Sequence, residues 1–249
     1  MTALRTQPNG HRRRTRHGAP WTSLPKLRPA QQALLCDWLR ADAAERQWQS
    51  LLDIAGAQPL EALGIARFAP LLWLGGSLTL NTPGGCIDVA AAGLCGLPTR
   101  LFGAPARVRA PRRYWLIENR ASFERQALAA APGTCVVWLP GQPPQSWREA
   151  MQWLLQQAPA PADVSCDPDP AGVAIALAAG ALWHAVDLPW QAHRMQPQDW
   201  GAAPRLPLSA HDHAWLQRLQ ADPDLPATLR TLCTALQTQG HKAEQEFWL

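Results

Sequence analysis

Three short apolar runs alternate with stretches of helical periodicity, and this alternation constrains the fold more than any other feature of the chain. The apolar runs cover residues 114–117, 134–139 and 162–166, and the helical stretches cover 121–130, 147–157 and 171–183. Strands that alternate with helices of about a dozen residues form a parallel sheet with helices on its faces. Two more helical stretches, 211–220 and 225–239, follow. We therefore predict an α/β domain over residues 108–249.

Residues 29–107 have a different pattern. Apolar residues recur at helical spacing over 34–54, and a second short helix is expected over 59–67. The apolar runs 71–74 and 77–80 precede an Asn-Thr-Pro-Gly-Gly segment and the run 86–89, which predicts a β-hairpin. Helices followed by a hairpin fit a small winged-helix domain or a plain helical cap, and both interpretations stay open. The expected boundary with the α/β domain lies at residue 107.

The first residues of the chain are strongly basic. Residues 1–28 have no apolar periodicity, so we predict a disordered arm there. Seven of the 23 Lys and Arg residues lie within residues 1–36, which contain no acid, so the other 16 stand against all 19 acids. Arginines neutralise phosphates and release counterions, so Arg12, Arg13, Arg14 and Arg16 are predicted nucleic-acid contacts. The alternative is a solvated tail that only improves solubility.

The composition also predicts where the protein works. No window approaches the roughly 18 uninterrupted apolar residues of a membrane span. The basic N-terminus has no apolar stretch behind it, as a secretory signal would have. The six cysteines lack CxxC spacing, which fits a reducing compartment. We expect a cytoplasmic protein without a membrane partner.

Acidic residues follow two of the predicted strands. The first strand runs into Glu118, and the third runs into Asp167 and Asp169 in the segment DPDPAG, whose Gly172 would let the next helix begin close to the strand. Ligands bind where parallel strands end, and residues two apart in an extended segment point to the same side. We therefore expect the three carboxylates to converge on Mg²⁺ or Mn²⁺, which prefer such oxygen ligands. An Asp-x-Asp pair alone is also common in turns and helix caps.

This order of acidic motifs resembles the Toprim fold of topoisomerases, primases and certain nucleases. Three segments narrow the resemblance to the C-terminal domain of JetD, the nuclease subunit of Wadjet plasmid-defence systems: LIENRASF at 116–123, DPDPAG at 167–172 and AEQE at 243–246. The chain departs from the family at Ser122, where Thr is preferred, and at Ala243, where Leu is usual. Ser165 and Cys166 replace an aromatic residue and glycine. The region before residue 108 is also shorter than in the family. This departure concerns how the protein would be loaded onto DNA more than how it would cleave it.

The resemblance implies a Toprim-like endonuclease that hydrolyses DNA with Mg²⁺ or Mn²⁺. The implied metal ligands are Glu118, Asp167 and Asp169, and the terminal motif adds Glu244 and Glu246 as catalytic candidates. The implied partners are DNA and an SMC-like ATPase complex, with a homodimer if both strands are cut. Glu244 and Glu246 could equally be ordinary exposed acids without a catalytic role, and both interpretations stay open.

The residues around the acidic motifs leave further alternatives. Arg120 follows Glu118 closely enough to contact a phosphate, although a surface ion pair is the commoner role of such an arginine. A Toprim-like module that binds DNA or a partner without catalysis is the alternative function. Strand passage through a tyrosyl–DNA link is disfavoured, because Tyr114 is the only tyrosine and stands at the start of the first strand.

Overall fold

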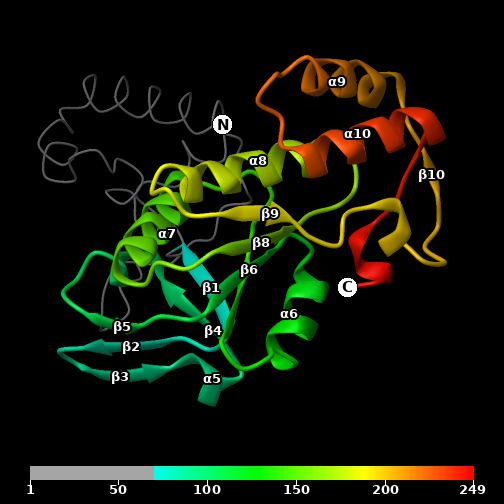
Figure 1. The fold of residues 1–249 in the computed structure, drawn as a ribbon. Coiled ribbons are helices and arrows are strands. Elements are labelled where there is room, and N and C mark those ends of the chain that lie inside the picture. Colours follow the sequence, from blue (N-terminus) through cyan, green and yellow to red (C-terminus); the bar gives the residue numbers. More distant parts are fainter. Residues whose placement is uncertain (1–69) are drawn as a thin grey trace, which may run out of the picture. The chain divides into compact units, whose positions relative to one another are not determined.

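The computed structural model describes residues 70–249, and a six-stranded sheet runs through them (Figure 1). The strand order is β4-β1-β7-β6-β8-β9. The strands are β1 (Leu71–Gly76), β4 (Leu94–Pro98), β6 (Arg113–Ile117), β7 (Thr134–Trp138), β8 (Ala162–Ser165) and β9 (Trp190–Ala192). Strands β7, β6, β8 and β9 are parallel, whereas β1 pairs antiparallel with both β7 and β4. The prediction of an α/β fold is confirmed.

The five longer helices fall where the periodicity placed them. They are α6 (Arg120–Leu128), α7 (Gln145–Gln157), α8 (Pro170–His184), α9 (Ala210–Gln220) and α10 (Ala227–Gln239). The shorter elements are α5 (Val89–Ala92), η1 (Thr99–Leu101), η2 (Pro197–Asp199), η3 (Gln245–Phe247), β10 (Leu206–Pro207) and β11 (His241–Lys242). Within the described range, no helix combines the length and the apolar character that crossing a bilayer requires.

The sheet separates two apolar clusters, because successive residues of a strand point to opposite faces. Leu116 of β6 and Val137 of β7 belong to the large cluster, which also contains the buried residues of α7 and α8. Ile117 and Val136, their neighbours in sequence, belong to a smaller cluster with Phe123 of α6. Helices α7 and α8 therefore cover one face of the sheet and α6 covers the other (Figure 1).

The boundary expected at residue 107 is wrong for the sheet. Strands β1 and β4 precede that residue, yet they extend the same sheet through the pairing of Leu74 with Val137 and of Leu74 with Cys95. The change of rhythm near residue 107 separates the antiparallel pair β1 and β4 from the helix-connected parallel strands β6, β7, β8 and β9 of the same sheet. The expected basic arm and the expected helices over 34–67 lie outside the described residues.

The predicted hairpin is confirmed for its second half. Strands β2 (Thr79–Thr82) and β3 (Gly85–Asp88) pair antiparallel around Pro83 and Gly84. Strand β5 (Arg107–Arg109) joins the other side of β2 and completes a small sheet in the order β3-β2-β5. The run 71–74 is not part of this hairpin, because it forms β1 of the large sheet.

Candidate functional site

Glu118 and Asp167 lie side by side where two neighbouring parallel strands end. Strand β6 ends at Ile117 and strand β8 ends at Ser165, and the two strands are paired. The backbone N–H of Glu118 donates to the carbonyl of Ser165 over 3.0 Å and continues this pairing past the strand ends. The backbone N–H of Asp167 then donates to Glu118 Oε2 over 3.2 Å. The parallel sheet thus brings together two carboxylates that are far apart in sequence.

Asp169 is close to this pair but has other partners. Its Oδ1 accepts the backbone N–H of Gly172 over 2.7 Å and caps the N-terminus of α8. Its Oδ2 lies 3.8 Å from Lys242 Nζ, which is also 3.1 Å from Asp212 Oδ2. One of the three expected metal ligands therefore serves as a helix cap and faces an ammonium group.

Gly172 has the role that the sequence predicted. A Cβ atom at this position would lie 1.9 Å from the carbonyl oxygen of Asp167, so only glycine lets α8 begin this close to the end of β8. The same turn is tightened by a hydrogen bond over 2.8 Å from the backbone N–H of Asp169 to the carbonyl of Asp167.

The C-terminal segment reaches the strand ends through Gln245, which the sequence reasoning missed. Its backbone N–H donates to Asp167 Oδ1 over 2.7 Å, and its side-chain Oε1 accepts the backbone N–H of Asn119 over 3.2 Å. The Gln245 side chain is fully buried, and its amide nitrogen has no hydrogen-bond partner within the described residues. Gln245 stands between Glu244 and Glu246, but its uncharged side chain gives no signal of a metal or catalytic site in the sequence.

The two terminal glutamates flank the carboxylate pair. Both are exposed, and Glu246 Oε2 lies 3.5 Å from the side-chain nitrogen of Asn119. Their charges act on the pair from outside, because both raise the pKa of Asp167. Glu244 and Glu246 therefore add negative charge near Asp167 without a hydrogen bond to it.

Burial and mutual repulsion raise the pKa values of the clustered carboxyls. Desolvation, with help from the charges of Asp167 and Asp169, raises the pKa of Glu118 to about 7. Desolvation likewise raises the pKa of Asp167 to about 6, and the nearby Asp169, Glu244 and Glu246 add to the effect. Burial raises the pKa of Asp169 too, against the opposing influence of the Gly172 N–H and of Lys242. Ionising these carboxyls therefore costs free energy in the folded protein.

The donor chemistry of this cluster fits a hard divalent cation, since carboxylate oxygens that repel one another are stabilised by Mg²⁺ or Mn²⁺. Glu118 and Asp167 would hold such an ion, and Asp169 would join them by exchanging Lys242 for it. Within residues 70–249, no group of three or more His, Cys, Asp or Glu side chains is already arranged around a metal position.

The guanidinium of Arg120 is engaged in local contacts. Its Nε lies 2.6 Å from Glu124 Oε1, and its Cζ lies 4.0 Å from the centre of the Trp73 ring. The predicted phosphate contact would have to replace this ion pair and this cation–π interaction. The other four predicted nucleic-acid contacts, at positions 12–16, lie outside the described residues.

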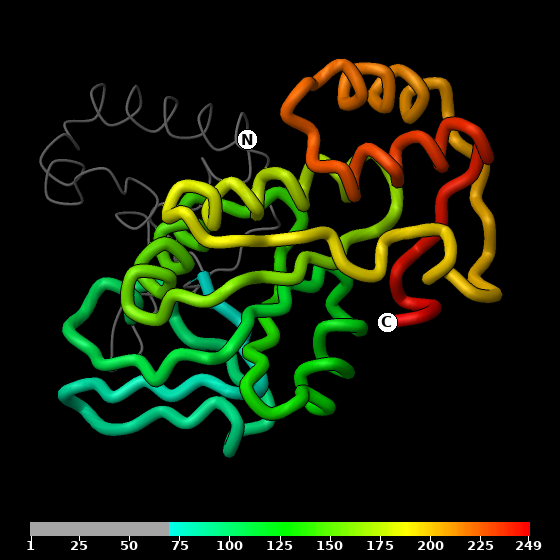
Figure 2. Tube along the Cα trace, in the orientation of Figure 1, coloured from blue at the N-terminus to red at the C-terminus, as the bar shows by residue number. Residues whose placement is uncertain are grey.

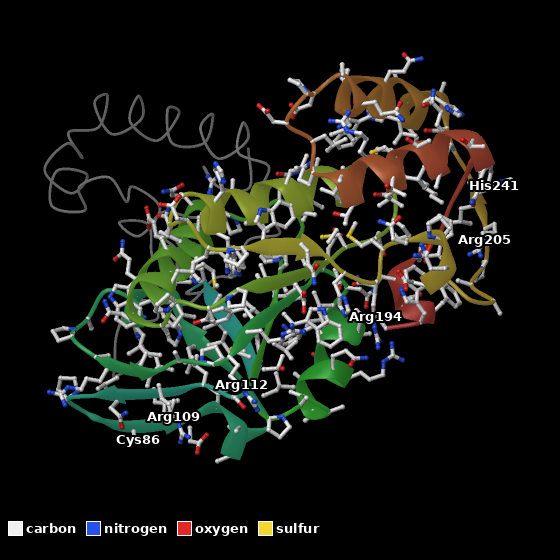
Figure 3. The ribbon with its side chains drawn as sticks, in the orientation of Figure 1. Cys86, Arg109, Arg112, Arg194, Arg205 and His241 are labelled. Carbon is white, nitrogen blue, oxygen red and sulfur yellow. The ribbon has the colours of Figure 1, made fainter. Side chains whose placement is uncertain are left out.

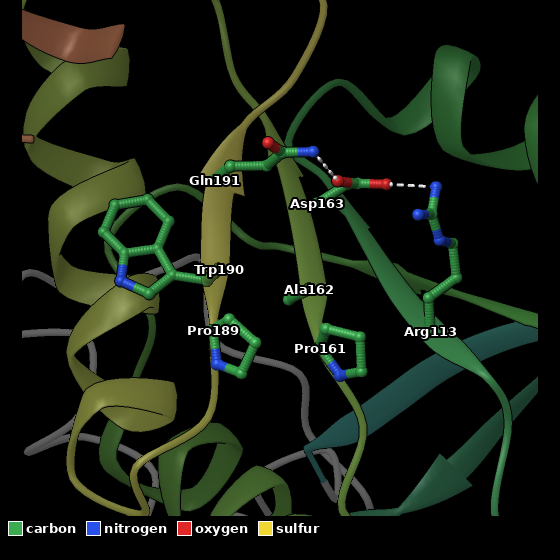
Figure 4. A pocket seen from close by; sticks show the side chains of 7 residues that line it. All are labelled: Arg113, Pro161, Ala162, Asp163, Pro189, Trp190 and Gln191. Carbon is green, nitrogen blue, oxygen red and sulfur yellow. Dashed lines mark hydrogen bonds and ion pairs between the residues drawn. The ribbon is translucent and has the colours of Figure 1, made fainter. Parts of the chain in front are cut away.

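A pocket of about 240 Å³ lies at the opposite edge of the sheet, at the amino ends of β6, β8 and β9 (Figure 4). Asp163 lines it, is only 5% exposed, and accepts from Arg113 Nη1 and from Gln191 Nε2 over 2.8 Å each. These bonds tie three strands together and satisfy the buried carboxylate, so we interpret the group as structural.

Comparison with models of known protein families finds no match for this chain. A comparison with curated proteins finds no significant relative either. The geometry of the site therefore carries the functional argument.

Proposed function

We propose that this protein is a divalent-metal-dependent DNA endonuclease that resembles the nuclease subunit of an SMC-like plasmid-defence complex. What supports the proposal is the meeting of the three sequence segments on which the resemblance rests. Asp167 of the second segment is hydrogen-bonded both to Glu118 of the first and to Gln245 of the third, and Gln245 also binds Asn119. Segments that only share a chance likeness with a family have no reason to assemble at one place.

The proposed chemistry divides between the cation and the chain. Glu118 and Asp167 would hold a divalent cation at this end of the strands, and the cation would supply stabilisation of the negative charge on a scissile phosphate. Gln245 fixes the orientation of Asp167 through the bond to Oδ1. The buried amide nitrogen of Gln245 is a remaining donor beside the cluster.

Hydrolysis is favoured over a tyrosyl–DNA link. Tyr114 is the only tyrosine of the chain, and it is fully buried. Its hydroxyl donates to the carbonyl of Ala158 over 2.9 Å, so it is not available to attack a phosphate.

A non-catalytic DNA- or partner-binding module is the second candidate, and the position of Lys242 favours it. The ammonium group stands 3.8 Å from Asp169 and 3.1 Å from Asp212, where it supplies positive charge to the carboxylates. An adaptor that had replaced its metal with a lysine would have this arrangement.

Cleavage of supercoiled plasmid by the purified protein, alone and with its SMC-like partners, tests the proposal. We expect cleavage in Mg²⁺ or Mn²⁺, none in EDTA, and a loss of roughly 100-fold or more in the isosteric Asp167→Asn variant. Asp224→Asn, which changes an exposed carboxylate elsewhere, is the matched control and should cut normally. Undiminished cleavage in EDTA or by Asp167→Asn would contradict the proposal. A protein that binds DNA without cutting it, and whose melting temperature Mg²⁺ does not raise, would be the adaptor.

A further inference from the structure

Charged residues are divided unevenly along the described range. Residues 70–117 contain five arginines, at positions 100, 107, 109, 112 and 113, and a single acid, Asp88. Residues 118–249 contain 13 acids against eight Lys and Arg residues, and the carboxylate cluster lies among them. A polyanion that approaches the cluster is repelled there, so its attraction has to come from another surface.

Arg107 and Arg109 stand together on the solvent side of β5. The pairing of β5 with β2 sets Val108 against Leu80, which is fully buried, and sets the two arginines against Asn81 and Thr79. Because side chains alternate along a strand, both arginines share the face opposite the core. Both are exposed, and β5 is an edge strand of its sheet.

Arg107 and Arg109 have no acidic partner in the part of the chain that the structure describes, and the charged groups near them are bonded to other atoms. Arg113 pairs with Asp163 over 2.8 Å, and Arg112 donates to the carbonyl of Pro132 over 2.9 Å. Asp88 shares the small sheet but accepts the backbone N–H groups of Ala90 and Ala91 as the cap of α5. Figure 3 shows Arg109 and Arg112 in the same part of the molecule, near Cys86 of β3.

We propose that Arg107 and Arg109, here termed the β5 surface, bind the phosphate backbone of duplex nucleic acid. The inference takes DNA as the partner from the proposed function, but it needs no cleavage. Residues two apart on a strand are separated by roughly 7 Å, which suits successive phosphates of one nucleic-acid strand. Phosphate contacts of this kind position a duplex without reading its sequence.

An acidic protein partner fits the β5 surface less well. Protein interfaces have an apolar, desolvated centre ringed by polar groups. The large hydrophobic side chains exposed in the described range are Leu128, Val186, Leu206 and Phe247, and none of them belongs to the small sheet. Among the described residues, these arginines have neither an acidic partner nor an apolar centre beside them, and such a surface matches a phosphate backbone.

The test is the affinity of the full chain for a fluorescein-labelled duplex, measured by anisotropy in EDTA at several salt concentrations. The variant R107Q/R109Q should bind more weakly, and the slope of log affinity against log salt should become shallower by about 1.8, since each phosphate contact contributes about 0.9. The control R148Q/R218Q removes two exposed arginines from α7 and α9 and should keep the slope of the unchanged protein. The variant R107K/R109K, which keeps both charges, should retain most of the affinity.

Each result decides the inference independently of catalysis. An unchanged slope in R107Q/R109Q, or equal losses in the control, would overturn it even if the protein cuts DNA. Binding to polyglutamate but not to the duplex would assign the β5 surface to an acidic protein and overturn it as well. Weaker and less salt-dependent binding by a protein that never cuts would support the β5 surface while the endonuclease proposal fails. Equal melting temperatures for all variants ensure that folded proteins are compared.

Discussion

Glu118 and Asp167 are carboxylates in an environment that disfavours their ionised form. An isolated carboxylate is stable in water, whereas these two are partly buried, adjacent, and near three further acids. Such groups raise the free energy of the folded protein at neutral pH unless a cation or a proton compensates them. A metal-binding site is therefore stabilised when a cation neutralises its carboxylates, whereas an accidental cluster of acids is not.

The raised pKa values predict how stability depends on pH. Both carboxyls bind a proton more tightly in the folded than in the unfolded chain, because their pKa values rise to about 7 and about 6. In EDTA, the stability they contribute is full below pH 4 and is lost as the pH rises toward 7. We expect the free energy of unfolding to fall by up to about 4 kcal/mol from pH 5 to pH 8, as measured by urea denaturation, since each pKa unit corresponds to about 1.4 kcal/mol. Mg²⁺ should restore stability mainly at the higher pH.

The variant Asp167→Asn isolates this contribution. It removes one titrating group and one of the charges that raise the pKa of Glu118, so its stability should depend less steeply on pH. His193 acts in the opposite direction, because burial lowers its pKa, but it does so equally in both proteins. Parallel pH profiles for the unchanged protein and Asp167→Asn would show that the carboxyls do not interact as described.

The C-terminal segment is the element that completes the candidate site. Arg125 of α6 donates through Nε to the carbonyl oxygen of Leu249 over 2.9 Å, and Gln126 donates to the same oxygen. The Leu249 side chain is 2% exposed and packs in the cluster with Phe123 of α6. Figure 2 shows the C-terminal segment beside α6. These contacts hold η3 where Gln245 can reach Asp167.

Leu249→Ala should therefore weaken both the fold and the site. We expect a loss of about 2 kcal/mol in unfolding free energy from the lost packing, together with reduced cleavage well below the melting temperature. Phe247→Ala is the matched control in the same segment, because that side chain is 53% exposed and should change neither quantity. If the two variants behaved alike, the packing of Leu249 would not be what positions the segment.

On the scale of the whole molecule, positive charge occurs in two separate places along the chain. One is the β5 surface, and the other is the basic stretch within residues 1–36. The acidic remainder carries the carboxylate cluster. The arginines would attract a duplex at long range, whereas the carboxylates would repel it at short range. The duplex would therefore reach the cluster only when a bound cation offsets this repulsion.

The basic stretch should contribute to DNA binding independently of the β5 surface. Replacing Arg12, Arg13, Arg14 and Arg16 with Gln should weaken binding and make the salt slope shallower by about 2 to 4, depending on how many arginines meet phosphates. Its effect should add to that of R107Q/R109Q, because each phosphate contact releases its own counterions. The measurement is the same anisotropy titration, with melting curves as the control. A quadruple variant with the original slope would reduce the basic stretch to a solubility tail.

The sequence by itself determined three strands (β6, β7 and β8) and five helices (α6 to α10) between residues 113 and 239, but it did not predict β9, the short parallel strand at the edge of the same sheet. Apolar runs of strand length, helical periodicity and the glycine at 172 depend on neighbours within a few residues, so they could be read directly. The same local logic located Glu118 and Asp167 at adjacent strand ends, because the carboxyl ends of parallel strands meet at one edge of a sheet.

Only the tertiary structure decided which distant segments meet. The antiparallel addition of β1 to β7 and the placement of Lys242 against Asp169 each join residues more than 50 positions apart. The position of Gln245 between Asn119 and Asp167 does the same. Such pairings depend on which strand edge and which sheet face remain open once the other elements have packed, and no local pattern records this. The carboxylates could thus be found from the sequence, whereas the lysine that neutralises one of them and the glutamine that orients another emerged from the fold.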